Sequence, residues 1–233
     1  MRKKLTDRPA IFSIYILLML FCNPAQAQNF KPEEMPLSVS SSHGSKETLM
    51  IYLTGDGGMN GFSKSFIHAL ELQGYGVVAL DSRKYFWNEK QPSQFASDLE
   101  QVAKYYQKLW NKPFVEVIGY SFGADVAAFL PKKISSGFRS ELKKLVLLSP
   151  SSSTDFVIRL RDLLAHGDST DGKYKTAPEL QKPSVKITCV FGKDETLFLK
   201  DRLKDVDKVT IKEIPGDHQY QKDFNLLMKI INM

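Results

Sequence analysis

Short apolar runs alternate with longer segments of helical periodicity along most of this chain, and that alternation restricts the fold more than any other feature. The apolar runs are residues 49–53, 76–80, 114–118, 145–149, 187–191 and 209–214. Glycine, proline or charged residues bound them, which is typical of strands, and their near-continuous apolar character indicates burial on both faces. The segments with helical spacing are residues 62–73, 93–110, 122–134, 155–164 and 220–231. We therefore predict an α/β fold with a mostly parallel sheet and helices on both faces.

No connection between these predicted elements is long enough to form a large lid domain. A length of 233 residues commonly folds around one core. We predict one domain over residues 48–233. Residues 28–47 are polar and rich in proline and serine, and we expect them to be a leader that can pack on the edge of the domain.

The first 27 residues have the composition of an export signal. They combine a basic start, an apolar run over residues 11–21 and the small-residue site Ala25-Gln26-Ala27. The apolar run is shorter than the roughly 20 residues that a membrane-spanning helix needs. We therefore predict a cleaved signal peptide over residues 1–27 and a mature chain outside the cytoplasm. Cys189 is then the single cysteine of the mature chain, which excludes an intramolecular disulfide.

The charge balance argues against a nucleic-acid partner. The chain holds 32 Lys and Arg against 26 Asp and Glu, and the predicted signal peptide carries part of this excess. No basic run is interleaved with aromatic residues, as a nucleic-acid surface would require. We expect no nucleic-acid binding.

Residues 119–123 read Gly-Tyr-Ser-Phe-Gly and lie between a predicted strand and a predicted helix. A strand that turns this sharply into a helix brings neighbouring backbone so close that glycine is needed on both sides of the central residue. The strained serine then projects at the helix N-terminus. This context favours Ser121 as a nucleophile over the alternative of an ordinary turn.

A serine nucleophile needs a histidine base that is oriented by an acid, and in the α/β-hydrolase fold the three follow in the order Ser, acid, His. His218 lies late enough, in a polar loop between the last predicted strand and helix, and we predict that it is the base. The alternative is a surface loop histidine. The acid should follow the strand that ends at residue 191, where Asp194 and Glu195 compete. Spacing from Gly192 favours Glu195, and residue type slightly favours Asp194.

Two backbone N–H groups are expected to bind the oxyanion of the reaction intermediate. One belongs to Phe122, directly after the nucleophile. The other should come from Asp56 or Gly57 in the Gly-rich loop 54–58, which follows an early strand. This loop lacks the lysine of a phosphate-binding loop and the pattern of a dinucleotide site. We therefore expect neither a cofactor nor a metal.

The motifs together resemble those of the VirJ/AcvB family of bacterial virulence proteins. They are Leu-Thr-Gly-Asp-Gly-Gly at 53–58, Asp-Ser at 81–82, Tyr-Phe-Trp at 85–87, Asp-Leu at 98–99, Gly-Tyr-Ser-Phe-Gly-Ala-Asp at 119–125 and Gly-Asp-His at 216–218. The similarity extends from about residue 49 to the C-terminus. Gln219 stands where we expect a second histidine, and the chain has the short form without the additional N-terminal domain of AcvB.

The resemblance implies a periplasmic α/β hydrolase. The AcvB members imply hydrolysis of aminoacyl-phosphatidylglycerol, notably the lysyl ester, so the implied partner is a phospholipid headgroup at the membrane surface. The VirJ members imply periplasmic proteins of a type IV secretion system as further partners. Two other functions stay open: a general carboxylesterase or lysophospholipase, and a non-catalytic assembly factor with a relic triad.

Two further groups of residues are candidates for substrate binding. The successive aromatic residues Tyr85, Phe86 and Trp87 form either part of the core or an aromatic rim at a lipid headgroup. The carboxylates of Asp56 and Asp125 are not needed by the triad. They either cap helix N-termini or bind the ammonium group of an aminoacyl ester.

Overall fold

The fold is taken from a computed structural model that describes residues 30–159 and 168–232. The predicted signal peptide and residues 160–164 of a predicted helix lie outside the described residues.

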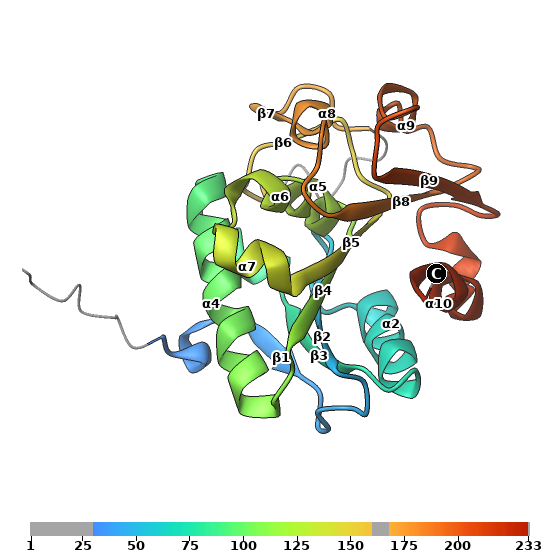
Figure 1. The fold of residues 1–233 in the computed structure, drawn as a ribbon. Helices are drawn as coiled ribbons and strands as arrows, with labels where there is room; N and C mark the ends of the chain where they lie inside the picture. The colour runs from blue at the N-terminus through green and yellow to red at the C-terminus, as the bar shows by residue number, and fades with distance from the viewer. Residues whose placement is uncertain (1–29, 160–167, 233) are drawn as a thin grey trace, which may run out of the picture. The chain divides into compact units, whose positions relative to one another are not determined.

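A 7-stranded sheet forms the centre of the fold, in the order β1-β3-β2-β4-β5-β8-β9 (Figure 1). The strands are β1 (Leu37–Val39), β2 (Thr48–Leu53), β3 (Gly76–Leu80), β4 (Phe114–Tyr120), β5 (Leu142–Leu148), β8 (Lys186–Gly192) and β9 (Val209–Ile214). β1 pairs antiparallel with β3, and every other pairing in this sheet is parallel. In register, Ile51 of β2 lies between Val78 of β3 and Val117 of β4. All three are fully buried, as their unbroken apolar runs predict.

Helices cover both faces of this sheet. The longer ones are α2 (Gly61–Leu72), α4 (Pro92–Trp110) and α10 (Phe224–Ile231). The shorter ones are α3 (Ser82–Tyr85), α5 (Phe122–Ala127), α6 (Leu130–Lys133), α7 (Ser136–Glu141), α8 (Thr176–Glu179) and α9 (Leu199–Arg202). α2 and α10 lie on one face, and α4 and α7 on the other (Figure 1). Alternate residues of β2 therefore face opposite layers, and Met50 and Tyr52 pack with Phe66 and Leu227 of α2 and α10.

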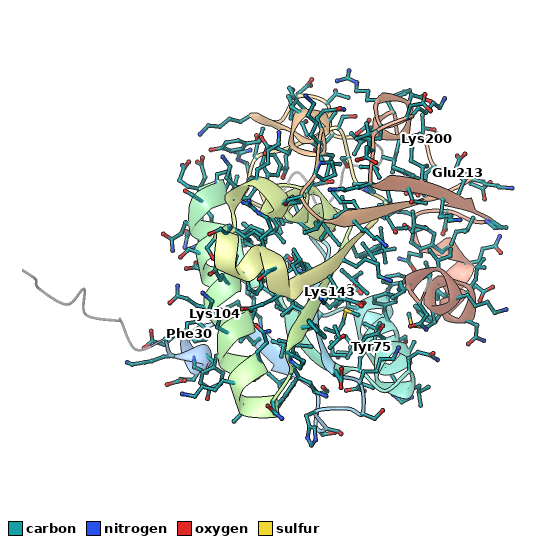
Figure 2. All side chains as sticks on the ribbon, viewed as in Figure 1. Phe30, Tyr75, Lys104, Lys143, Lys200 and Glu213 are labelled. Carbon is teal, nitrogen blue, oxygen red and sulfur yellow. The ribbon has the colours of Figure 1, made fainter. Side chains whose placement is uncertain are left out.

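Small elements complete the described chain. The 3-10 turns are η1 (Pro32–Glu34) and η3 (Tyr220–Lys222), and a two-stranded sheet joins β6 (Ser153–Thr154) to β7 (Tyr174–Lys175). An ion pair links α9 to β9, with Lys200 Nζ 2.5 Å from Glu213 Oε1 (Figure 2). It ties together the two elements on either side of loop 203–208.

The architecture confirms the predicted α/β-hydrolase fold, and several boundaries differ from the predictions. The leader contributes β1, so the sheet begins before residue 48. The predicted helix 122–134 is broken between α5 and α6, because the ring of Pro131 clashes with the carbonyl four residues earlier, at Ala127, where α5 ends. Residues 155–159 are not helical. The predicted helix 220–231 starts as a 3-10 turn, and α10 begins only after Asp223, whose side chain accepts a hydrogen bond from the Leu226 N–H.

Candidate active site

Three loops at the carboxyl ends of parallel strands carry the predicted triad. Ser121 follows β4, Glu195 lies after β8 and His218 lies after β9. Because parallel strands end at the same edge of the sheet, their loops meet there, and ligands commonly bind at this edge in α/β folds. The fold thus brings together residues that are up to 97 positions apart in sequence.

Ser121 occupies a strained turn between β4 and α5. Its φ is 54°, in the left-handed region that non-glycine residues rarely adopt. Its N–H donates to the Leu148 carbonyl at 2.8 Å, which anchors the turn on β5. A Cβ on Gly119 would lie 2.4 Å from the Gly123 carbonyl oxygen, and one on Gly123 would lie 2.4 Å from that of Leu53. The two glycines are therefore required by close backbone contacts.

Ser121, His218 and Glu195 form one hydrogen-bonded chain. Ser121 Oγ lies 2.8 Å from His218 Nε2, and His218 Nδ1 lies 2.5 Å from Glu195 Oε1. The Glu195 side chain is 6% exposed and that of His218 is 46% exposed. In this arrangement the carboxylate holds the proton on Nδ1, and Nε2 is free to accept the proton of Ser121. Asp194, the rival acid, is exposed to solvent.

The Gly-rich loop after β2 lies against the nucleophile. A Cβ on Gly55 would be 3.3 Å from the Cβ of Ser121, and Gly58 N–H donates to the Gly55 carbonyl at 3.0 Å to close a turn. Within the described residues, no group accepts a hydrogen bond from the backbone N–H of Phe122, Asp56 or Gly57. These N–H groups are available to an oxyanion formed at Ser121.

The two extra carboxylates have different surroundings. Asp125 is 5% exposed, and its Oδ1 accepts a hydrogen bond from the Ser151 N–H at 2.5 Å. Burial raises the pKa of Asp125 well above its usual range. The expectation that Asp125 binds substrate is therefore corrected, since its carboxyl is buried within the domain. Asp56 is partly exposed and directly follows Gly55, which lies against the nucleophile.

The three successive aromatic residues separate into core and surface. Tyr85 is 7% exposed and Phe86 is fully buried, whereas Trp87 is 54% exposed. The Phe86 ring packs against that of Phe122, with the centroids 5.1 Å apart. Tyr85 and Phe86 thus belong to the core that packs against Phe122 at the start of α5. Of the expected aromatic rim, only Trp87 is exposed.

Sequence reasoning missed two residues next to the triad acid, Ser149 and Tyr220. Ser149 Oγ lies 2.7 Å from Glu195 Oε2 and 2.5 Å from the Tyr220 hydroxyl. The position of Ser149 at the end of a strand, next to the nucleophile strand, was the one available signal. Tyr220 had the appearance of an ordinary core aromatic residue.

Comparison with known proteins gives a family and a fold. Residues 47–233 match a family model described as bacterial virulence protein (VirJ). A comparison with curated protein sequences gives no significant match. Across residues 30–159 and 168–232, no helix has both the length and the apolar character of a bilayer-spanning segment.

Similar solved structures are α/β hydrolases. A lipase-esterase related protein from Clostridium acetobutylicum is 14% identical with a TM-score of 0.61, over 85% of this chain and 98% of that one. Est1E from Butyrivibrio proteoclasticus, bound to ferulic acid, is 15% identical with a TM-score of 0.59, over 86% and 94%. An alpha-beta serine hydrolase homologue from Coxiella burnetii is 14% identical with a TM-score of 0.57, over 84% and 88%. These likenesses show the fold.

Proposed function

Since this chain belongs to the VirJ family of bacterial virulence proteins, we propose that it is a serine hydrolase that cleaves the aminoacyl ester of phosphatidylglycerol, with the lysyl ester as the foremost substrate. The observation that carries this proposal is the chain of short contacts from Ser121 Oγ through His218 to Glu195. The names of similar structures, which include esterases and a serine hydrolase homologue, support a hydrolase.

The proposed reaction has two stages. Ser121 Oγ attacks the ester carbonyl carbon while His218 Nε2 accepts the proton of the Ser121 hydroxyl. Glu195 stabilises the resulting imidazolium. The N–H groups of Phe122 and of Asp56 or Gly57 stabilise the oxyanion. The intermediate then collapses, and the glycerol oxygen leaves with the proton from His218. Water, deprotonated by His218, next attacks the aminoacyl-serine ester, which releases the amino acid and restores Ser121.

The substrate class is supported by the resemblance to AcvB and by Asp56. This partly exposed carboxylate lies in the loop against Ser121, where it can pair with the ammonium group of an aminoacyl ester. Trp87 is exposed after β3, and tryptophan is favoured at lipid headgroups. We further propose export by the N-terminal signal and action at the periplasmic membrane surface.

The nucleophile is tested with a fluorophosphonate probe on the mature protein. Ser121→Ala should abolish labelling and lower kcat for ester hydrolysis by on the order of 10⁶-fold, because the attacking oxygen is lost. Covalent labelling is read on a gel, and circular dichroism checks that the variant folds. Labelling that persists in a folded Ser121→Ala variant would place the nucleophile elsewhere.

The substrate class is tested by comparing a lysyl ester with a neutral acyl ester of the same alcohol. Asp56→Asn should lower kcat/KM for the lysyl ester by about tenfold or more, and leave the neutral ester nearly unchanged, because only the lysyl group pairs with the carboxylate. Asp194→Asn is the matched control, since it removes an exposed carboxylate from another loop at the same edge.

Equal losses for both esters in Asp56→Asn would favour a general carboxylesterase, in which Asp56 only shapes the oxyanion loop. A large loss for both esters in Asp194→Asn would instead make Asp194 the triad acid. In cells, loss of the gene should raise the level of aminoacyl-phosphatidylglycerol, measured by lipid mass spectrometry.

A further inference from the structure

The second oxygen of the triad carboxylate is held by two donors. Glu195 Oε1 faces His218, while Oε2 accepts hydrogen bonds from the Gly192 N–H at 2.6 Å and from Ser149 Oγ at 2.7 Å. Gly192 is the last residue of β8, directly before the loop that carries Glu195. Ser149 belongs to a different segment, directly after β5, so its hydrogen bond ties the acid to the neighbouring strand.

Ser149 is in turn held by Tyr220, which is fully buried. The Tyr220 hydroxyl lies 2.5 Å from Ser149 Oγ and 3.1 Å from the Val190 carbonyl. Two hydroxyl oxygens this close need a proton between them. An ionised carboxylate can only accept, so the Ser149 proton is used for Glu195. Tyr220 has one proton, for which Ser149 Oγ at 2.5 Å competes with the Val190 carbonyl at 3.1 Å. The contact with Ser149 is the shorter, and the Val190 carbonyl already accepts from the Ser149 N–H, so the proton goes to Ser149 and the chain runs from Tyr220 to Ser149 to Glu195.

Both residues have a strained backbone that local hydrogen bonds hold in place. Ser149 has a φ of 52° and Tyr220 a φ of 54°, in the left-handed region that side chains with a Cβ avoid. The Ser149 N–H donates to the Val190 carbonyl at 2.8 Å, and the Tyr220 N–H donates to the Asp217 carbonyl at 2.9 Å. These bonds hold two unfavourable conformations, in which the Ser149 hydroxyl faces Glu195 and the Tyr220 hydroxyl faces Ser149.

We propose that Ser149 and Tyr220 are positioning residues of the triad, a role that rests on the proposed hydrolase function. By donating to Oε2, Ser149 holds Oε1 toward His218 and takes up part of the carboxylate charge. Burial excludes water that could replace this donor, since Ser149 and Tyr220 are both fully buried. Tyr220 polarises the Ser149 hydroxyl and fixes its direction.

Loss of the Ser149 hydroxyl would leave more negative charge on the oxygen that faces His218, which favours the imidazolium. Protonation of His218 stops it from acting as a base, so the acidic limb of the pH–rate profile should move to higher pH. The other titratable groups near His218 and Glu195 are Tyr120, whose ring is 5.3 Å from that of His218, and, around Tyr120, Tyr52 and the carboxylates of Asp56 and Asp217. Of these, only Tyr52 is altered below, in a control variant.

The experiment compares Ser149→Ala and Tyr220→Phe with wild type, using p-nitrophenyl acetate as a neutral ester. Ser149→Ala should lower kcat about 10- to 100-fold, as loss of a residue that orients a functional group commonly does, with little change in KM. Its acidic limb in kcat/KM should move to higher pH. Tyr220→Phe should also lower kcat and move the acidic limb to higher pH, but by less, because Ser149 can still donate to Glu195.

The chain offers matched controls in Tyr52 and Ser63. They form another buried tyrosine–serine pair, with the two oxygens 3.2 Å apart, and neither contacts Glu195 or His218 through a hydrogen bond. Tyr52→Phe and Ser63→Ala make the same chemical changes and should leave the acidic limb in place. They measure how much of any loss in kcat comes from disturbing the core.

A readout that is independent of activity is the proton resonance of the His218 Nδ1–H in the bond to Glu195. It should shift in Ser149→Ala and Tyr220→Phe and stay in place in the two controls. If neither variant moves this resonance or the acidic limb, and only the melting temperature changes, the two residues are merely structural. If wild type neither hydrolyses esters nor reacts with a fluorophosphonate, the proposed function fails, while the resonance still tests the hydrogen-bonded chain.

Discussion

At the scale of single residues, Asp125 is a carboxyl group in an environment that disfavours its charge. It is 5% exposed, and no lysine, arginine or histidine among the described residues lies within ion-pair distance of it. Burial raises its pKa, and the nearby carboxylates of Asp168 and Asp56 raise it further, against the Ser151 N–H, which lowers it. The folded protein thus keeps Asp125 protonated to a higher pH than the unfolded chain does.

The stability of the protein should therefore depend on pH through Asp125. The unfolded chain releases this proton near the usual aspartate value of about 4, whereas the folded protein releases it only at higher pH. Stability is full below the unfolded value and falls as pH rises toward the folded value. Asp125→Asn keeps an oxygen acceptor for Ser151 without the charge. The free energy of unfolding of this variant, relative to that of wild type, should therefore increase as pH rises.

Urea unfolding between pH 4 and 9 measures this difference. Asp171→Asn removes an exposed carboxylate and serves as the control, with an expected change within about 0.5 kcal/mol at every pH. An Asp125→Asn variant that is equally destabilised at all pH values would show that the ionised carboxylate is part of the native structure.

The reactive residues of the site could be predicted from the sequence, and the residues that hold them could not. Ser121 could be predicted because the nucleophile needs a sharp turn, which has a sequence motif. His218 could be predicted because the base comes last in the order Ser, acid, His. The choice between Glu195 and Asp194 stayed open, because the two residues are adjacent and the path of the loop decides which side chain faces His218. Ser149 has only its position at a strand end as a signal and Tyr220 has no motif, because their role depends on a contact between residues 71 positions apart.

At the scale of elements, α5 is pressed against the end of β2 so closely that Gly123 has no room for a side chain. A Cβ there would lie 2.4 Å from the Leu53 carbonyl and 2.5 Å from that of Thr54. Both contacts are with backbone, which cannot rotate away. The oxyanion loop follows directly, so any shift of β2 would be transmitted to Asp56.

Gly123→Ala should therefore destabilise the protein by about 1 to 3 kcal/mol and lower kcat, as overpacking of a tight contact does. Thermal unfolding and ester hydrolysis measure the two effects. Gly61→Ala is the matched control, because a Cβ at this first residue of α2 meets nothing within 4 Å. It should be neutral or stabilising by up to about 1 kcal/mol. Equal stability of the two variants would mean that α5 and β2 can separate without cost.

The strands were easier to predict than the helices, for physical reasons. The central strand β3 is buried along its whole length, so its apolar run ends where burial ends and its bounds match the prediction. β9 also matches its predicted bounds, although it is an edge strand with only its last residue buried. A helical period, by contrast, continues through a break if apolar residues keep their spacing. Pro131 and Asp223 mark the two breaks, and each acts on the backbone rather than on the apolar pattern.

At the scale of the whole molecule, the sheet ends at β1 on one side and at β9 on the other. β9 carries the charged residues Lys212 and Glu213, which disfavour pairing with another chain. On the other side β1 covers the edge of β3. The Asp81 N–H donates to the Pro36 carbonyl at 2.9 Å, and Ser40 Oγ accepts from the Val77 N–H at 2.8 Å. The polar leader thus protects a fully buried strand.

A chain that begins at residue 41 should therefore be less stable than one that begins at residue 36, although the two differ by only a few residues. The shorter chain loses β1 and leaves the N–H and C=O groups of β3 unpaired, at about 1 kcal/mol for each hydrogen bond lost. For a domain of this size, a few such bonds lower the Tm by about 5 °C or more. The exposed edge should also promote association, measured by light scattering.

Activity per folded molecule should not change, because β3 and β2 separate β1 from the strand that carries Ser121. The chain that begins at residue 36 keeps β1 and should match one that begins at residue 28, and equal Tm values for all three chains would show that β1 does not stabilise the sheet.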